Sequence, residues 1–210
     1  MSSRENILGR LKKAAEKRNA PTAAQPDFEA PIYLQTDKSL ADWFQENLEL
    51  VAGKVLRPKN LQEAVALIKQ LAAEENLERI FCSDPVLQQA LKGQVAFQND
   101  AEDFIQLQAG ITPCEFLVAH LGSVMVSSAG ASGRRLHVFP ETHLVVAHKN
   151  QLVAHLDDAL EQLQQKYNGN LPSMVTNITG PSRTADIEKT LVMGMHGPKK
   201  LFVLLCDEPF

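Results

Sequence analysis

A chemically suggestive stretch lies near the carboxyl end of the chain, where an apolar run ends in the turn Gly180-Pro181. Glycine gives the backbone freedom and proline fixes φ, so this pair predicts a sharp stop after a strand over residues 174–178. Ser182 and Thr184 are residue types that cap helices, and the pattern predicts a helix that begins near Thr184. A helix amino terminus presents unpaired backbone N–H groups, which suit a phosphate or a carboxylate.

Arg183 and Asp186 belong to the same stretch and would add charge to such a site. The guanidinium of Arg183 is a planar, permanently charged donor that could clamp a small anionic metabolite, with Asp186 orienting it. An aspartate in the first turn also interacts favourably with the helix dipole. The alternative is a well-capped connection in which Arg183 only pairs with a carboxylate.

His196 lies between glycines in Gly194-Met195-His196-Gly197-Pro198, directly before the last apolar run. An imidazole exchanges protons near neutral pH, and loops often carry ligand-binding residues. We predict that His196 and Gly197 belong to the same binding cleft as Arg183. The alternative is a histidine that holds two turns together through its ring nitrogens.

Gly122-Ser123 and the small-residue loop over residues 127–130 form a second candidate cradle. Small side chains allow backbone N–H groups to approach an anion closely. Neither segment matches a P-loop or a G-x-G-x-x-G fingerprint, so the sequence gives little support to nucleotide binding. We predict that Gly122 and Ser123 complete the cleft, with a plain turn as the alternative.

The sequence gives little support to thiol, metal or serine-hydrolase chemistry. Cys82, Cys114 and Cys206 are far apart and show no metal-binding spacing, whereas an iron–sulfur cluster needs about four cysteines. The scattered histidines form no H-x-H or H-E-x-x-H pattern, and no serine lies in a G-x-S-x-G elbow. We therefore predict no metal and no cofactor in this chain, and we interpret most lone histidines, including His137, as packing or surface residues.

The chain has 210 residues, 44% of them hydrophobic, and a formal net charge of −4 at pH 7. This length and composition are typical of one globular domain with a real core and a small appendage. A negative net charge without a basic run argues against a nucleic-acid surface. No apolar segment reaches the roughly 18 residues of a membrane span, and no signal-peptide core opens the chain, so we predict a cytoplasmic protein.

Residues 2–18 predict an amphipathic helix, because apolar residues recur at helical spacing and the opposite face is basic. Residues 19–38 contain three prolines and few apolar residues, which is typical of a linker. We therefore predict an N-terminal arm over residues 1–38 and an α/β domain over residues 39–210. The apolar stripe of the arm is thin and lacks Trp and Phe, which favours docking on protein over a membrane-surface role.

Residues 39–97 alternate between helical and strand patterns, which predicts a parallel sheet flanked by helices. The predicted elements are helices over 39–50, 60–72 and from 84 onward, and strands over 53–56, 79–82 and 94–97. Short apolar runs over 136–139 and 143–147 predict strands in an antiparallel or mixed portion of the sheet. Residues 200–206 are apolar on both faces and predict a central strand. The predicted class is α/β, with a mostly parallel sheet and a mixed portion.

Two blocks of the sequence resemble a known family. One is Thr179 through Glu188 followed by Gly194 through Pro198, and the other is Ala119 through Val124 with the turn Pro140-Glu141-Thr142-His143. On these blocks the chain resembles the lactate utilization protein C family (LutC/YkgG), which is built on the LUD domain. The resemblance implies a fold like that of the NagB/RpiA/CoA transferase-like proteins. It also implies a role in bacterial oxidation of L-lactate to pyruvate, beside partner proteins that carry the iron–sulfur clusters.

One position departs from the related sequences, which usually have an acidic residue followed by Thr where this chain has His120 and Leu121. A CoA transferase of similar fold uses a Glu in that neighbourhood as its nucleophile, and an imidazole cannot form the same acyl anhydride, so the departure argues against CoA transfer. Two alternatives stay open. One is a stand-alone enzyme or binding protein for a small phosphorylated or carboxylated metabolite. The other is an interaction module that acts through residues 1–30. The sequence leaves open whether the chain forms a homodimer.

Overall fold

The computed structural model describes residues 3–16, 33, 36–98, 104–185 and 191–210. The chain divides into two compact units, Met1–Asp37 and Lys38–Phe210. The described part of the first unit is chiefly the helix α1 (Ser3–Glu16), whose apolar side chains Ile7, Leu8 and Leu11 are exposed. No helix in the described ranges has the length and the apolar character needed to cross a membrane.

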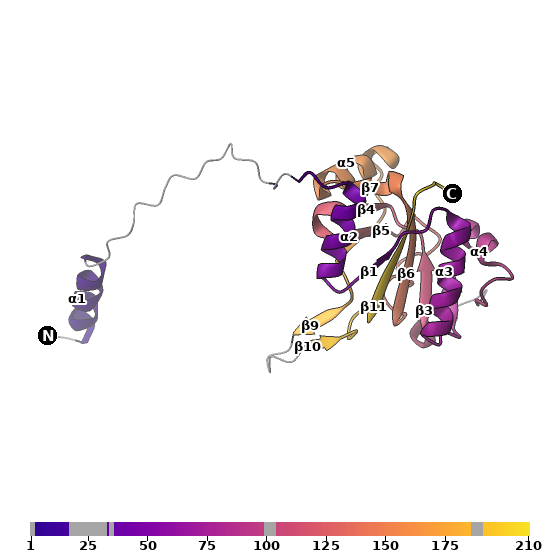
Figure 1. Ribbon diagram of the computed structural model, residues 1–210. Coiled ribbons are helices and arrows are strands. Elements are labelled where there is room, and N and C mark those ends of the chain that lie inside the picture. The colour runs from indigo at the N-terminus through magenta and orange to yellow at the C-terminus, as the bar shows by residue number, and fades with distance from the viewer. Residues whose placement is uncertain (1–2, 17–32, 34–35, 99–103, 186–190) are drawn as a thin grey trace. The chain divides into compact units, whose positions relative to one another are not determined.

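The second unit alternates helices and strands along the chain (Figure 1). Its α-helices are α2 (Leu40–Leu50), α3 (Leu61–Glu74), α4 (Pro85–Leu91) and α5 (Leu156–Lys166). Short 3₁₀ helices are η1 (Phe104–Gln106), η2 (Ala119–Leu121) and η3 (Lys149–Gln151). The strands are β1 (Lys54–Leu56), β2 (Ile80–Cys82), β3 (Ala109–Thr112), β4 (Phe116–Val118), β5 (Ser123–Ser127), β6 (Thr142–His148), β7 (Leu152–Val153), β8 (Val175–Ile178), β9 (Arg183–Ala185), β10 (Leu191–Met193) and β11 (Lys200–Cys206).

Five strands form a parallel sheet in the order β1-β11-β6-β3-β2. Strand β11 lies inside this sheet and pairs with β6 from Lys200 opposite Thr142 to Cys206 opposite His148. Its side chains alternate between the two faces, with Phe202 packed on one side and Val203 on the other. This arrangement explains why the strand is apolar throughout, and it confirms the predicted central position.

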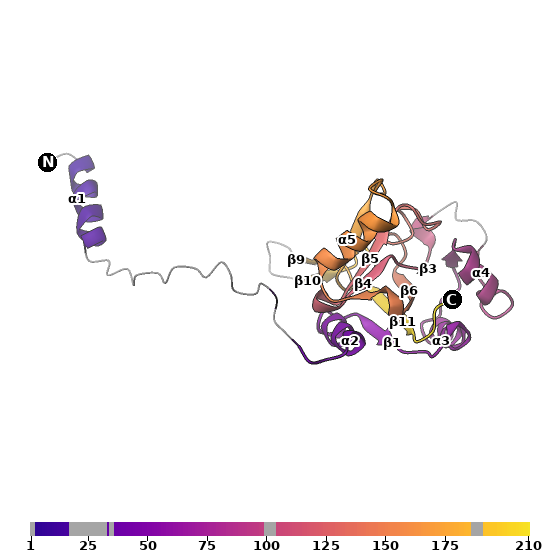
Figure 2. The same cartoon turned by 90° about the horizontal axis from the view of Figure 1, so that it is seen from above.

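A second sheet has the order β7-β4-β5-β8, in which β5 runs antiparallel to β4 and β8 while β7 runs parallel to β4. A mixed portion is therefore present and the α/β class is confirmed, but the predicted strand over 143–147 does not belong to it, because β6 pairs parallel with β3 and β11. Helices α3 and α4 cover one face of the parallel sheet, and α2 packs between the parallel and the mixed sheet. Helix α5 covers the outer face of the mixed sheet, and Figure 2 shows it on the side of the second unit opposite α2 and α3.

Local capping signals set the helix starts of the second unit. Ser39 accepts a hydrogen bond from the backbone N–H of Asp42, and Asn60 accepts one from that of Glu63. Asp84 caps α4 and is followed by a proline in the first turn. Because each cap satisfies backbone donors that the helix leaves unpaired, these starts fall where the sequence predicts them.

Three predicted elements are wrong. No helix begins at Thr184, because residues 183–185 form β9 and pair antiparallel with β10, with Thr184 opposite Val192. Residues 136–139 form no strand but a turn, in which the backbone N–H groups of Val138 and Phe139 donate to Arg135. Residues 94–97 form no strand, and the adjacent Gln98 makes an isolated parallel bridge with Phe81.

Candidate functional site

A cavity of about 450 Å³ lies beside strand β8, and we call it the β8 cavity. Alternate residues of and before β8 form one wall, and the turn that follows the strand forms another. Its lining residues are His137, Val138, Met174, Thr176, Ile178, Thr179, Gly180, Pro181, Ser182, Arg183, His196, Gly197 and Pro198. His137 precedes β6 and Pro198 precedes β11, so the cavity lies at the amino ends of these two parallel strands.

The turn at Gly180 is held tightly against the rest of the second unit. Gly180 has φ of 79°, and a Cβ there would lie 2.4 Å from the carbonyl oxygen of Val51. Ser182 donates its backbone N–H to Pro198 over 2.8 Å, and its carbonyl accepts from Gly194 over 2.9 Å. The turn and the His196 loop are therefore joined by backbone hydrogen bonds. The backbone N–H of Ser182 is therefore not free to bind an anion.

The β8 cavity brings together several of the residues that the sequence singled out, namely Gly180, Ser182, Arg183, His196 and Gly197. The side chains of Arg183 and His196 are exposed, so they form the rim. Thr184 lies in β9 and is not among the lining residues. Asp186 lies outside the described residues. That these residues bind a ligand stays a prediction.

Gly122 and Ser123 lie apart from the cavity and support it indirectly. Gly122 has φ of 60°, and a Cβ there would lie 2.2 Å from the backbone nitrogen of Leu48. Its lack of a side chain lets α2 approach, which is a packing role. The hydroxyl of Ser123 lies 2.7 Å from the hydroxyl of Thr179, a lining residue, so Ser123 braces the turn from behind.

His137 is a lining residue that the sequence analysis did not select. Its side chain is 4% exposed. Burial lowers the pKa of His137, and the backbone groups of Gly133 and Ser127 that lie against the ring oppose this shift. The ring is therefore a neutral donor and acceptor at neutral pH.

A second buried histidine stands behind the first. The rings of His137 and His143 have centroids 5.5 Å apart and are tilted by 58°. His143 is fully buried, and its Nε2 lies 2.8 Å from the hydroxyl of Thr112. Burial, with a smaller contribution from His137, lowers the pKa of His143 to about 3. This pair adds no positive charge near the cavity at neutral pH.

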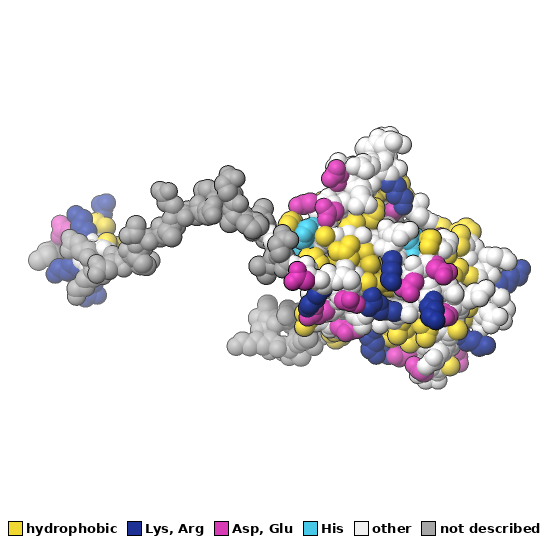
Figure 3. All heavy atoms as spheres, turned by 45° about the horizontal axis from the view of Figure 1, so that its top comes forward, with side chains coloured by type: hydrophobic (Ala, Val, Ile, Leu, Met, Phe, Trp, Pro, Cys, Tyr) yellow, Lys and Arg dark blue, Asp and Glu magenta, His cyan; other side chains and the backbone are white. Residues whose placement is uncertain are grey.

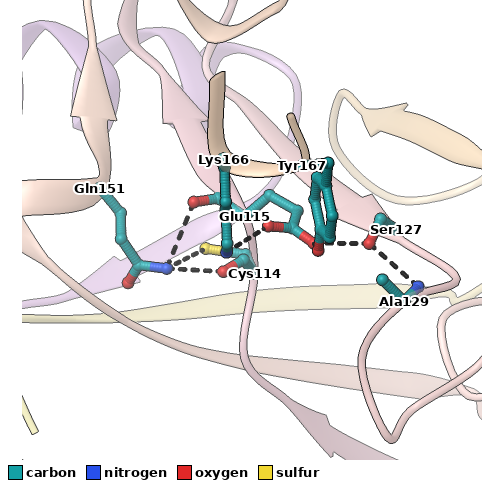
Figure 4. A network of polar contacts seen from close by, with 7 residues as sticks. All are labelled: Cys114, Glu115, Ser127, Ala129, Gln151, Lys166 and Tyr167. Atoms are coloured by element: carbon teal, nitrogen blue, oxygen red, sulfur yellow. Dashed lines mark hydrogen bonds and ion pairs between the residues drawn. The ribbon is translucent and has the colours of Figure 1, made fainter. Parts of the chain in front are cut away.

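The most elaborate polar cluster of the described residues surrounds Glu115 (Figure 4). Its carboxylate accepts from Lys166 over 2.6 Å, from Ser127 over 2.5 Å and from Tyr167 over 2.8 Å. Burial opposes ionisation, but these hydrogen bonds lower the pKa of Glu115. Gln151 donates to the carbonyl oxygen of Cys114 over 2.6 Å on the same loop. Both carboxylate oxygens thus have partners, and the cluster joins α5 to the mixed sheet.

Metal and thiolate sites find no support in the described residues. No group of three or more His, Cys, Asp or Glu side chains within these ranges is placed to hold a metal ion. Burial raises the pKa of Cys82 to about 12 and that of Cys206 to about 11, and it also raises the pKa of Cys114. All three thiols are therefore protonated at neutral pH, whereas metal binding uses the thiolate.

Comparison with known proteins gives the family. The model of the LUD domain matches residues 41–206, which include every residue of the β8 cavity. The chain belongs to the LUD domain family. Lactate utilization protein C 1 of Bacillus mycoides is 28% identical over 166 residues, covering 78% of this chain and 71% of that protein. Lactate utilization protein C of Bacillus subtilis is 37% identical over 105 residues, covering 49% of this chain and 44% of that protein.

Other LUD domain comparisons agree. The protein YkgG of Escherichia coli is 34% identical over 105 residues, covering 49% of this chain and 46% of that protein. The matched segments thus span less than half the length of the B. subtilis and E. coli relatives. A crystal structure of a DUF162 family protein from Deinococcus radiodurans covers 80% of this chain and 96% of its own, with a TM-score of 0.58 and 17% identity, and so shows the fold alone. The predicted membership of the LutC/YkgG group is confirmed.

Proposed function

We propose that this LUD domain protein is the cluster-free component of a bacterial L-lactate utilization system in the cytoplasm. In this system L-lactate is oxidised to pyruvate, and partner proteins carry the iron–sulfur clusters. The observation that carries the proposal is the match of the LUD domain over residues 41–206, together with relatives named lactate utilization protein C. Oxidation of lactate to pyruvate releases two electrons, so some component must accept them.

The chain itself is poorly equipped to accept electrons, which supports a division of labour with partners. It has three cysteines, whereas one thiolate-bound cluster needs about four. The thiols of Cys82 and Cys206 are buried. We therefore assign the iron–sulfur chemistry to partner proteins, and we assign to this chain the binding of a small anionic metabolite.

The β8 cavity supports that assignment through its charge. Arg183 is the one permanently charged side chain among the described lining residues, and none of them is acidic. A guanidinium at an exposed rim attracts a carboxylate and can bind it through two hydrogen bonds. The face drawn in Figure 3 differs from the cavity lining, because its Lys and Arg side chains are interspersed with Asp and Glu side chains. That face offers no broad basic patch for a nucleic acid.

The proposal is tested by deletion of the gene from its host and complementation with variants. We expect the deletion strain to lose growth on L-lactate and Arg183→Ala to restore it poorly. Arg79→Ala removes an exposed arginine outside the lining residues and should restore growth fully. Because Arg183 is exposed, its loss should cost about 0–1 kcal/mol of stability. Normal growth of the deletion strain on L-lactate, together with no co-purifying iron–sulfur protein, would contradict the proposal.

The size of the cavity favours a second candidate function. A volume of about 450 Å³ falls within the range of about 300–1,000 Å³ that holds ligands much larger than a three-carbon acid. The chain would then be an enzyme or binding protein for a larger phosphorylated or carboxylated metabolite. A thermal-shift screen tests this, since a ligand at about 100 times its Kd adds roughly 2.7 kcal/mol. Stabilisation by a sugar phosphate, but not by L-lactate, would favour the second function.

A further inference from the structure

The mouth of the β8 cavity carries exposed apolar side chains. Val138 lines the cavity and is 43% exposed, and Met195, directly before the lining residue His196, is 62% exposed. Met193 is 36% exposed and lies directly opposite Arg183 in the pair of β9 and β10. Residues directly opposite each other in an antiparallel pair point to the same face, so Met193 lies beside the Arg183 side chain that lines the cavity. We call Val138, Met193 and Met195 the mouth patch.

Backbone hydrogen bonds hold the two methionines at the mouth. Gly194, which lies between them, donates its N–H to the carbonyl oxygen of Ser182 over 2.9 Å, and Ser182 donates its own N–H to Pro198 over 2.8 Å. Ser182 and Pro198 both line the cavity. The two methionines are therefore attached to the cavity wall, and Figure 1 shows β9 and β10 at the edge of the second unit, where another protein can reach them.

The composition of the mouth patch indicates what covers it. Single exposed apolar residues are common on any protein, whereas exposed apolar side chains gathered around a cavity mouth are typical of a surface that another molecule covers. Methionine is flexible and polarisable, and methionine and arginine are both enriched at protein–protein interfaces. The mouth patch with Arg183 beside Met193 therefore favours a protein as the covering molecule.

The charge at the mouth limits which protein can bind there. Arg183 is the one permanently charged side chain among the described lining residues, and none of them is acidic. A second copy of the chain that docked through the same patch in a two-fold contact would bring a second Arg183 into the interface, where like charges repel. A partner surface that is apolar and has no basic side chain avoids this repulsion.

We propose that the mouth patch is the docking surface for the partner protein that carries the electron acceptor, and that this partner contacts it through an apolar surface without basic side chains. The assignment rests on the proposed function, because it gives the partner in that system its place on this chain. Oxidation of lactate to pyruvate releases two electrons and two protons, of which the electrons pass to the iron–sulfur clusters of the partner and the protons to water. A partner docked at the mouth is adjacent to a metabolite in the cavity and excludes water from it.

The methyl groups of the methionines report the docking in the full-length protein. The probe is the iron–sulfur protein that co-purifies with this chain from its host, prepared separately and added to chain labelled with ¹³C at its methionine methyl groups. We expect the NMR signals of Met193 and Met195 to shift when the partner is added. The signal of Met125, which is buried in β5 of the mixed sheet, should stay in place.

Two matched variants test the same surface by calorimetry with the same purified partner. Met195→Asp places a charge in the mouth patch and should weaken binding at least about tenfold, because a charge buried in an interface without a partner is costly. Val86→Asp places the same charge at an exposed apolar residue of α4 outside the mouth patch and should leave the affinity unchanged. If Met195→Asp fails to fold, the methyl signals of the wild-type protein decide alone.

Three results would overturn the proposal. The first is a complex in which the Met193 and Met195 signals do not move, and the second is a Met195→Asp protein that binds the partner as tightly as the wild type does. The third is a shift of these signals with rising concentration of the chain alone, together with a dimer mass in ultracentrifugation, which would assign the mouth patch to a second copy.

Failure of this assignment is distinguishable from failure of the proposed function. A strain that needs the gene for growth on L-lactate, with a partner that binds this chain away from the mouth patch, removes the docking surface alone. Normal growth of the deletion strain on L-lactate, with no iron–sulfur protein that binds the chain, removes the lactate system and the docking surface together.

Discussion

Nε2 of His143 lies 2.8 Å from the hydroxyl of Thr112, and this contact joins the neighbouring strands β6 and β3 inside the parallel sheet. Both side chains are fully buried. Burial disfavours the charged imidazolium, which lowers the pKa of His143 to about 3. The protein therefore holds a neutral histidine where the unfolded chain has one that titrates near 6.5.

This relationship makes stability depend on pH. Between pH 6.5 and 3 the unfolded chain binds a proton at His143 and the folded protein does not, so stability falls as the pH falls through this window. From pH 7.5 to pH 5 the loss from His143 should be about 2 kcal/mol. Urea unfolding at the two pH values measures it. His143→Gln, which does not titrate, should reduce the pH-dependent loss by that amount.

An exposed histidine provides the control for this experiment. His196→Gln, which removes an exposed histidine and leaves the buried one in place, should keep the difference between pH 7.5 and pH 5 close to that of the wild type. If His143→Gln also leaves the difference unchanged, the buried imidazole is not the source of the pH dependence.

The hydroxyl contact between Ser123 and Thr179 gives a second prediction. Ser123 is fully buried in β5 and lies 2.7 Å from Thr179, which belongs to the lining of the β8 cavity. Ser123→Ala should cost about 1 kcal/mol, because one hydrogen bond is lost while exposed Thr179 can bind water instead. A double-mutant cycle with Thr179→Val measures the coupling by urea unfolding. Additive effects would show that the contact contributes nothing.

Helices and strands with strong local signals could be predicted from the sequence. Ser39, Asn60 and Asp84 each cap a helix at the expected position, since a capping side chain acts within three residues of itself. The position of β11 inside the sheet was also predictable, because a strand covered on both faces has no polar side.

Elements decided by distant partners could not be predicted. Ser182 and Thr184 look like helix caps, but the backbone of residues 183–185 pairs with residues 191–193. A hairpin and the capped start of a helix use similar residue types. Which of the two forms depends on whether the segment pairs with another strand, and a short stretch of sequence does not reveal this. Residues 136–139 include three apolar side chains, yet only Leu136 and His137 among the four are buried, and the segment turns at Arg135.

The candidate site also depends on contacts between segments that are distant in the sequence, so it could be predicted only in part. Gly180 through Arg183 and His196-Gly197 meet at one cavity because the two loops are joined by backbone hydrogen bonds. Gly122 was selected as a small residue next to a serine, whereas its role is to let α2 approach. His137 was missed because nothing near it in sequence indicates burial, and apart from Val138 the other lining residues are nearly forty or more positions away.

The Glu115 cluster predicts a stability difference between two ion pairs of equal length. Glu115 is 9% exposed and bonds Lys166 over 2.6 Å, while the exposed Glu141 bonds Lys199 over 2.6 Å. Glu115→Gln should cost about 1–3 kcal/mol, because a buried network loses a partner. Glu141→Gln should cost about 0–1 kcal/mol. Urea unfolding at pH 7 compares them, and equal small costs would contradict the structural role of Glu115.

The same variant should respond to pH in a defined direction. The pKa of Glu115 is lowered in the folded protein, so its contribution is present above the ordinary pKa of a glutamate and is lost as the pH falls below it. The difference in stability between wild type and Glu115→Gln should therefore shrink on acidification below about pH 4.3.

Gly122 and Gly133 have nearly equal φ angles, so alanine variants at these positions distinguish the cost of backbone strain from the cost of steric crowding. Gly122 has φ of 60° and Gly133 has φ of 59°, but a Cβ at Gly122 would lie 2.2 Å from the backbone of Leu48, whereas at Gly133 it would meet nothing within 4 Å. Gly133→Ala should cost about 1–2 kcal/mol from the left-handed conformation alone. Gly122→Ala carries the same strain and must also push α2 away, which adds about 1–3 kcal/mol. Guanidinium unfolding of both variants measures the difference. A Gly122→Ala protein as stable as Gly133→Ala would mean that α2 yields freely, and the packing role assigned to Gly122 would then be wrong.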